Sequence, residues 1–275
     1  MEAGVSTVRQ QATDPAGGSG PLPAASVLSA APVLKEPRLL GGRLFWLEQL
    51  PAERGRTTLR LRTRQGAVLD LTPDLDLRSR IHGYGGGVYC LAGGSPAGDT
   101  VVVVVAEGGR SLWRLDLPGD SDHDTPAAPV PLVPVADPEP AGQEPALYGD
   151  GLIDLARQRW IGVCEQDGID RLVVVPLAGG APRLLWESPD FCGYAVLSPS
   201  GSHLAWLSWR QPCMPWERSQ LWLGRFEAQG ELVDVRAIAG SAPGDGRAVS
   251  VFQPLWRSEE HTSELQSQFR ISYAV

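Results

Sequence analysis

The sequence predicts an all-β fold: a partial β-propeller of about four four-stranded blades plus the start of a fifth, preceded by a flexible N-terminal leader. Three observations support this prediction. The 275 residues include 32 glycines and 24 prolines, the two residue types that are least favourable inside a helix. Short apolar runs of four to eight residues alternate with Gly, Pro and Asp turns, which is typical of strands. The runs also fall into groups of four, as propeller blades do.

The N-terminal segment, residues 1–32, is rich in Ala, Gly, Ser, Pro and Gln and has few large apolar side chains. Such a segment cannot bury enough apolar surface to offset the entropy lost on ordering. We therefore expect residues 1–32 to be a disordered leader.

Residues 33–256 form the predicted propeller, and its strands are expected in the following order. The first blade has strands at 43–50, 57–63 and 67–71, led by a strand near Val33. The second blade has strands at 87–92, 100–106, 111–117 and 130–135. The third has strands at 147–154, 160–165, 171–177 and 183–186. The fourth has strands at 194–197, 203–209, 220–226 and 232–238, and a fifth blade begins at 251–256.

The third strand of each group carries a similar pattern, TLRLRTRQG, SLWRLDLPG, RLVVVPLAGG and LWLGRFEAQG. A β-sandwich of sixteen strands is the alternative architecture, but this recurrence favours blades that stack on one another. The proline-rich stretch 120–145 is interpreted as a surface loop around one edge strand.

Composition excludes several classes of function. The formal net charge of −8 and the pI of about 5.1 argue against nucleic-acid binding, which needs a basic surface. No apolar stretch is long enough to span a bilayer, and the N-terminal residues lack the apolar h-region of a secretory signal, so we expect a cytoplasmic protein with no membrane partner. The four cysteines are far apart and form no CxxC pair, which predicts free thiols.

No cofactor is expected either. The sequence contains no HxxxH, HExxH or His-plus-carboxylate cluster, so we predict no metal site. The run Tyr84-Gly85-Gly86-Gly87 lacks the lysine of a phosphate-binding loop. Its glycines are expected to let the backbone turn tightly into a strand near the propeller axis.

Four motifs occur together in residues 33–256: FWLEQLPAERGR at 45–56, RSRIHGYGGGVY at 78–89, LSPSGSHLAW at 197–206, and WRQPCMPWE at 209–217 followed by LW. In this combination they resemble the N-terminal propeller of the prolyl-oligopeptidase family of serine peptidases, particularly its bacterial dipeptidyl- or acylaminoacyl-peptidase-like members. The sequence departs from the family at Gly83, where the family has a glutamate, and this puts a substrate-sensing carboxylate there in doubt.

The resemblance implies that the chemistry resides in a C-terminal α/β-hydrolase domain with a G-x-S-x-G nucleophile motif. That motif is absent here, so the resemblance implies a fragment with no catalytic residue that is itself inactive. In the intact enzyme the propeller would gate peptide substrates, with Tyr84, Trp209 and Trp216 as candidate gating residues. The alternative is a non-catalytic propeller that serves as a protein-interaction module.

The C-terminal tail, residues 257–275, contains no Gly and no Pro. Its beginning, RSEEHTSELQS, resembles the in-frame translation of a common sequencing-library adapter. We therefore expect residues 257–275 not to be native, and the gene to be truncated within the propeller.

Overall fold

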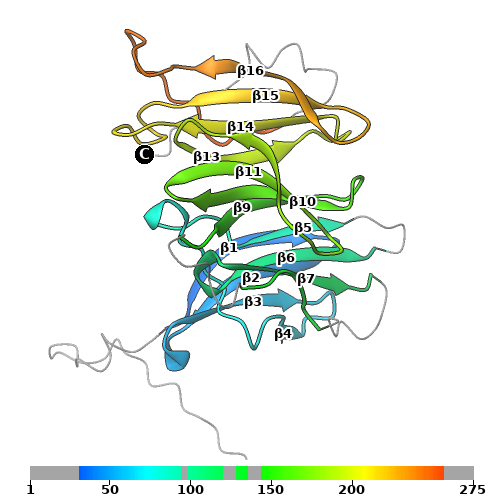
Figure 1. Cartoon of the computed structure of the whole chain (residues 1–275). Coiled ribbons are helices and arrows are strands. Elements are labelled where there is room, and N and C mark those ends of the chain that lie inside the picture. The colour runs from blue at the N-terminus through cyan, green and yellow to red at the C-terminus, as the bar shows by residue number, and fades with distance from the viewer. Residues whose placement is uncertain (1–30, 94–97, 120–127, 136–143, 257–275) are drawn as a thin grey trace, which may run out of the picture.

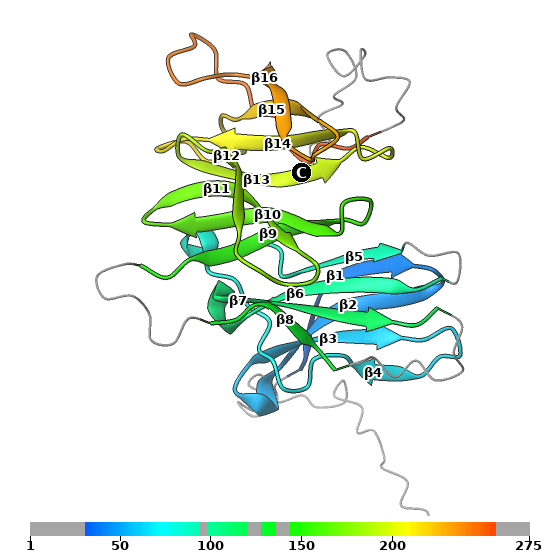
Figure 2. The same ribbon diagram turned by 45° about the vertical axis from the view of Figure 1, so that its right-hand side comes forward.

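The computed structural model describes residues 31–93, 98–119, 128–135 and 144–256. These residues form four antiparallel four-stranded sheets, each of them a simple meander (Figures 1 and 2). The prediction of an all-β partial propeller is thereby confirmed. Most of the predicted leader and all of the predicted tail lie outside the described residues, as does most of the stretch 120–145.

The strands of the four blades have the following bounds. Blade 1 contains β1 (Val33–Leu40), β2 (Arg43–Leu50), β3 (Arg56–Arg62) and β4 (Val68–Asp70). Blade 2 contains β5 (Tyr89–Gly93), β6 (Thr100–Ala106), β7 (Ser111–Leu117) and β8 (Val130–Val133). Blade 3 contains β9 (Leu147–Asp154), β10 (Arg159–Gln166), β11 (Ile169–Pro176) and β12 (Arg183–Glu187). Blade 4 contains β13 (Phe191–Leu197), β14 (His203–Trp209), β15 (Gln220–Phe226) and β16 (Leu232–Gly240).

Three short 3₁₀ turns connect these strands: η1 (Pro51–Glu53), η2 (Ile81–Gly83) and η3 (Glu107–Gly109). The described part of the chain contains no helix with the length and apolar character needed to cross a bilayer.

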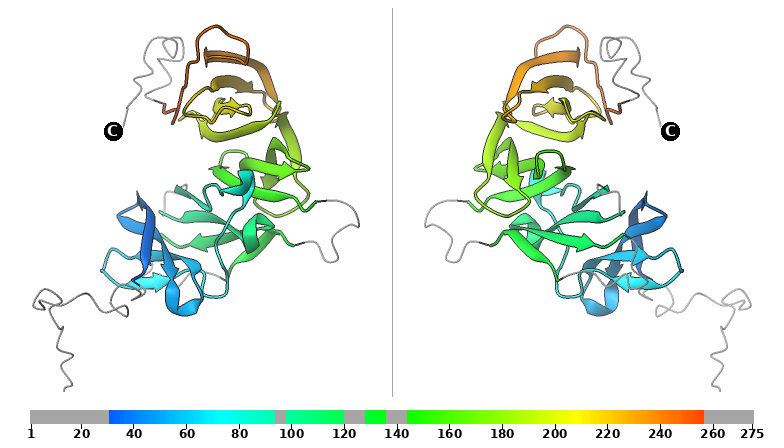
Figure 3. Two further views of the ribbon diagram at one scale, coloured as in Figure 1. Left: turned by 90° about the vertical axis from the view of Figure 1, so that its left-hand side faces the viewer. Right: turned by 90° about the vertical axis from the view of Figure 1, so that its right-hand side faces the viewer.

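The blades follow one another in an arc (Figure 3). The first strand of each blade lies on the inner side of the arc, where β5 packs beside β9 and β9 beside β13. Strand β6 is buried on both faces, because blades lie on either side of it. This explains why its sequence is a continuous valine run rather than an alternating pattern.

The core consists of apolar side chains held between neighbouring blades. One cluster joins residues of blades 1, 2 and 3, including Phe45, Val104 and Trp160. A second cluster joins blades 3 and 4 through residues such as Leu172 and Trp206. Each blade therefore completes its burial only against its neighbours, as stacked repeats do.

The predicted fifth-blade strand at 251–256 does not form. These residues lie along blade 4 instead, where the Ser219 hydroxyl donates to the Val251 carbonyl at 2.6 Å and the Trp256 indole donates to the Val196 carbonyl at 3.2 Å. A strand needs a partner for its backbone groups, and none of the described residues supplies one here.

Candidate functional site

The connection between β4 and β5 carries the RSRIHGYGGGVY motif, links blade 1 to blade 2 and contacts blade 3 on the way. The Ser79 hydroxyl donates to the Tyr148 carbonyl at 2.7 Å, and the Asp150 amide donates to the Gly87 carbonyl at 3.0 Å. The Gly87 amide in turn donates to the Asp150 carboxylate. These contacts fix the connection against the start of β9.

The glycines of this connection are required by close approach. A Cβ on Gly86 would lie 2.5 Å from Ile81 Cδ1 and 2.9 Å from an Asp150 carboxylate oxygen. Gly85 has a φ of +94°, which side chains rarely tolerate. The expectation that the glycines allow a tight backbone path into a strand agrees with this geometry.

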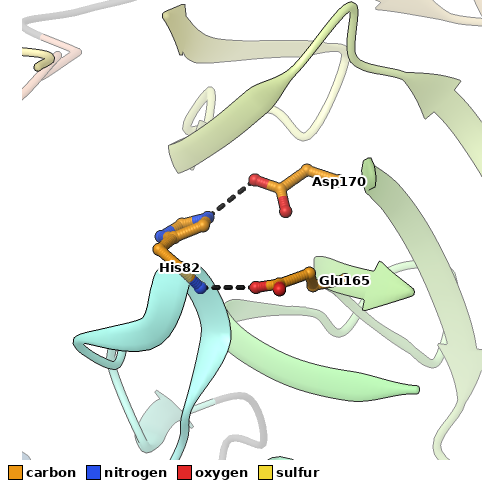
Figure 4. Close-up of side chains that lie close together, drawn as sticks. All are labelled: His82, Glu165 and Asp170. Carbon is orange, nitrogen blue, oxygen red and sulfur yellow. Dashed lines mark hydrogen bonds and ion pairs between the residues drawn. The ribbon is translucent and has the colours of Figure 1, made fainter. Parts of the chain in front are cut away.

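His82 is the centre of the site and has a left-handed φ of 60°. Its Nε2 lies 2.6 Å from Oδ2 of Asp170, and its backbone amide donates to the Glu165 carboxylate (Figure 4). Asp170 is fully buried, and its Oδ2 also accepts the Cys192 amide at 2.7 Å. A buried carboxylate needs such partners to offset its loss of hydration.

Aromatic rings surround the His82 imidazole. The ring centroids of Trp209, Tyr84 and Phe191 lie 5.2, 5.4 and 5.5 Å from that of His82. Phe191 and Trp209 stack at 5.8 Å with an interplanar angle of 22°. These rings leave the imidazole side chain 3% exposed, so His82 faces protein groups rather than water.

The inner strands β1, β9 and β13 share an irregularity at equivalent places. Each has a bulge in its pairing with the next strand, and a residue with a left-handed φ sits in each bulge: Glu36, Asp150 and Tyr194. Bulges of this kind re-aim side chains. Asp150 and Tyr194 line a cavity of about 410 Å³ between the inner strands.

The electrostatics of this cavity follow from burial. Burial raises the pKa of Asp150, and it raises the pKa of Tyr194 to about 12. The Asp150 charge contributes to the Tyr194 shift in the same direction. The cavity thus holds two acidic groups whose ionised forms are poorly hydrated.

Two of the three predicted gating residues come together at the site. Tyr84 is 61% exposed and Trp209 is 4% exposed, and both contact the His82 ring. Trp216 is 63% exposed on the β14–β15 loop and takes no part in this ring cluster. Trp209 also lines a separate cavity of about 280 Å³ next to Cys213 and Arg218.

The premise of the metal prediction needs correction, because the structure does assemble a histidine with two carboxylates. His82 comes from the β4–β5 connection, whereas Glu165 and Asp170 come from blade 3, and 83 and 88 positions separate His82 from them in the sequence. No local spacing could reveal them. An aspartate near the start of a mainly apolar strand, as at Asp170, is the signal that the sequence offered.

The fold and the site define a class: an incomplete β-propeller in which an interblade connection is held by a buried His–Asp pair. Among solved structures, the chain is similar to puromycin hydrolase, with 27% identity and a TM-score of 0.69 over 81% of this chain and 34% of that chain. It is also similar to a puromycin-hydrolyzing peptidase of Mycobacterium tuberculosis, with 30% identity and a TM-score of 0.65 over 80% of this chain and 34% of that chain.

The chain therefore spans about a third of the length of these two proteins. No protein-family model and no curated protein matches the sequence. Both solved relatives are prolyl-oligopeptidase-family peptidases, and the similarity covers only their propeller-like N-terminal part. The resemblance indicated by the motifs is thereby confirmed: the described fold is similar to the propeller-like N-terminal part of prolyl-oligopeptidase-family peptidases.

Proposed function

We propose that the chain acts as the propeller of a serine peptidase that hydrolyses peptides, and that its rim controls which substrates enter. The observation that carries this proposal is the 27–30% identity to two puromycin-hydrolysing enzymes over four-fifths of the chain. Puromycin consists of an amino acid joined through an amide to a nucleoside. A short substrate with an aminoacyl end is therefore the chemistry closest to these relatives.

In this proposal the propeller positions and selects substrate, and the bond is cleaved elsewhere. The exposed Tyr84 ring offers an apolar face and a hydroxyl to a passing peptide. The buried His82 ring packs against Tyr84 on one side and against Trp209 on another, and so holds the Tyr84 ring in place. Aromatic side chains suit such a role because they present a large contact area at low entropic cost. Trp216 offers a second exposed ring on the β14–β15 loop.

Two measurements test this proposal. The chain alone is expected to leave aminoacyl-p-nitroanilides and puromycin unhydrolysed, and turnover that a serine-directed inhibitor abolishes would contradict that expectation. The genomic reading frame beyond codon 256 is the second measurement. A downstream G-x-S-x-G codon run supports the peptidase, whereas an early stop codon supports the interaction module.

The gating role is tested in the intact enzyme. Tyr84→Ala is expected to raise KM for peptide substrates several-fold with little change in kcat, because it removes contact surface and not chemistry. Tyr84→Phe is the matched control, and its KM should stay close to that of the unaltered enzyme because the aromatic ring is kept. An unchanged KM in Tyr84→Ala would show that Tyr84 does not contribute to substrate gating.

A further inference from the structure

The His82 cluster brings three potential ligand groups together from three separate elements. His82 is in η2, Glu165 lies near the end of β10, and Asp170 lies near the start of β11. One imidazole nitrogen and one carboxylate oxygen from each acid all lie within 4.8 Å of one another. This arrangement is independent of the gating role proposed above.

The hydrogen bonds within the cluster leave one buried oxygen unused. Oδ2 of Asp170 accepts from Cys192 and pairs with His82, but Oδ1 has no hydrogen-bond partner among the described residues. The Asp170 side chain is completely buried. An ionised oxygen that is buried without a partner has a large desolvation cost. A positively charged group beside Oδ1 would offset this cost.

The unused oxygen faces a second carboxylate. Figure 4 shows one oxygen of Asp170 turned toward the side on which Glu165 lies. Glu165 is only partly buried, so the cluster reaches solvent on the Glu165 side. Two carboxylates that face each other repel unless a cation lies between them, and the single imidazole is the only basic group in this cluster of three.

We propose that His82, Glu165 and Asp170 bind one divalent transition-metal ion of the Zn²⁺ class. A mixed set of one imidazole nitrogen and two carboxylate oxygens suits Zn²⁺ and its neighbours, whereas Mg²⁺ and Ca²⁺ prefer oxygen ligands alone. Asp170 would ligate through Oδ1 and keep Oδ2 on the Cys192 amide. His82 would exchange its bond to Asp170 for the ion: Nε2 gives up its proton and ligates, and Nδ1 carries the single proton of the neutral ring.

The ion would have a structural role. It would tie the connection between blades 1 and 2 to the β10–β11 hairpin of blade 3, beside Tyr84 and Trp209. Because the site links segments that are distant in sequence, binding should stabilise the folded state over the unfolded chain.

The test is a titration of the chelator-treated full chain with ZnCl₂, followed by calorimetry and thermal unfolding. We expect one saturable site and a rise in melting temperature. Glu165→Gln and His82→Gln should each weaken the affinity by at least tenfold. Glu165→Gln keeps an oxygen acceptor for the His82 amide, so the fold is preserved, which circular dichroism verifies.

The matched controls are Glu187→Gln and His203→Gln, which alter a carboxylate and a histidine outside the cluster. Both should bind Zn²⁺ as the unaltered chain does. Absence of saturable binding, or equal affinity in Glu165→Gln and the unaltered chain, would overturn the site. Equal or tighter binding of Mg²⁺ or Ca²⁺ would overturn the metal class.

Discussion

Two inner strands of the same propeller, β1 and β9, differ sharply in burial. Strand β1 exposes seven of its eight residues, whereas β9 has four buried residues and four half-buried ones. Both strands pair with a second strand in their own sheet. The difference comes from the neighbours, because β9 lies between β5 and β13, whereas β1 lies at the end of the row and packs beside β5.

This comparison shows that a blade does not bury its own faces. Strand β1 leaves Val33, Leu34 and Leu39 exposed, although its backbone pairing is regular at both ends. Blade 3 has the same meander, but its side chains join the core clusters on both sides. Stability should therefore concentrate in the middle blades.

The largest expected effect is in blade 3. Trp160→Ala removes a side chain that is 1% exposed and packs edge-on against Tyr148 at 6.2 Å. We expect a loss of about 3–5 kcal/mol in the free energy of unfolding, measured by urea denaturation. Trp216→Ala is the control and should change the free energy of unfolding by no more than about 0.5 kcal/mol. Similar losses in the free energy of unfolding in both variants would contradict the conclusion that stability is concentrated in the middle blades.

A smaller effect is expected from added volume in β9. A Cβ on Gly151 would lie 1.9 Å from Trp160 Nε1, and the ring is held by its packing. Gly151→Ala should therefore destabilise the protein by about 1–3 kcal/mol in the same urea measurement. Gly246→Ala meets nothing within 4 Å and should be nearly neutral. A tolerated Gly151→Ala would mean that the Trp160 ring can move.

A pH-dependent effect is expected at Asp150, also in β9. Burial raises the pKa of its carboxyl above the ordinary 3.8, so the folded state binds the proton more tightly than the unfolded chain does. The protonated form then stabilises the fold at low pH, and this contribution disappears as the pH rises through the raised folded-state pKa.

Asp150→Asn stays neutral at every pH and keeps an oxygen for the Gly87 amide. Its melting temperature should exceed that of the unaltered chain by a few degrees at pH 7–8, and the gap should close as the pH falls toward 4. Asp234→Asn, at an exposed ion pair with Arg225, should show no such closing gap. A gap that is independent of pH would indicate that charge burial at Asp150 is not its cause.

The smallest effect on stability is expected in β1. Lysine at Leu34 and Leu39 together should change the free energy of unfolding by no more than about 0.5 kcal/mol, since both side chains are exposed. The double variant should, however, reduce self-association measured by sedimentation velocity, because it adds charge to an exposed apolar face. Val130→Lys is the control on β8. Equal self-association of the double variant and the unaltered chain would show that β1 is not the contact face.

The strands could be predicted because their signals are local. The valine run of β6 and the turns around it predicted Thr100–Ala106 without reference to any other residue. Strand β1 was predicted only as a strand near Val33, because the polar K-E-P-R segment interrupts its apolar pattern. The strand predicted at 251–256 would need a partner strand, and the residues 251–256 themselves do not show whether such a partner is present.

The site was only partly predictable. The motifs indicated Tyr84, Trp209 and Trp216 through a family resemblance, and the structure brings the first two to one imidazole. Asp150, Glu165 and Asp170 were not indicated, since each lies in a strand of blade 3 far along the chain from His82. Their significance comes from contacts between blades.

The sequence by itself determined the secondary structure and the repetition into blades, because turn residues and apolar runs act over a few neighbouring positions. Only the tertiary structure decided which side chains share a buried environment. His82 and Asp170 are 88 positions apart in the sequence, and yet His82 Nε2 lies 2.6 Å from Asp170 Oδ2. That proximity exists because the connection from blade 1 passes over the start of blade 3, and the stacking of blades, which no local pattern encodes, sets this path.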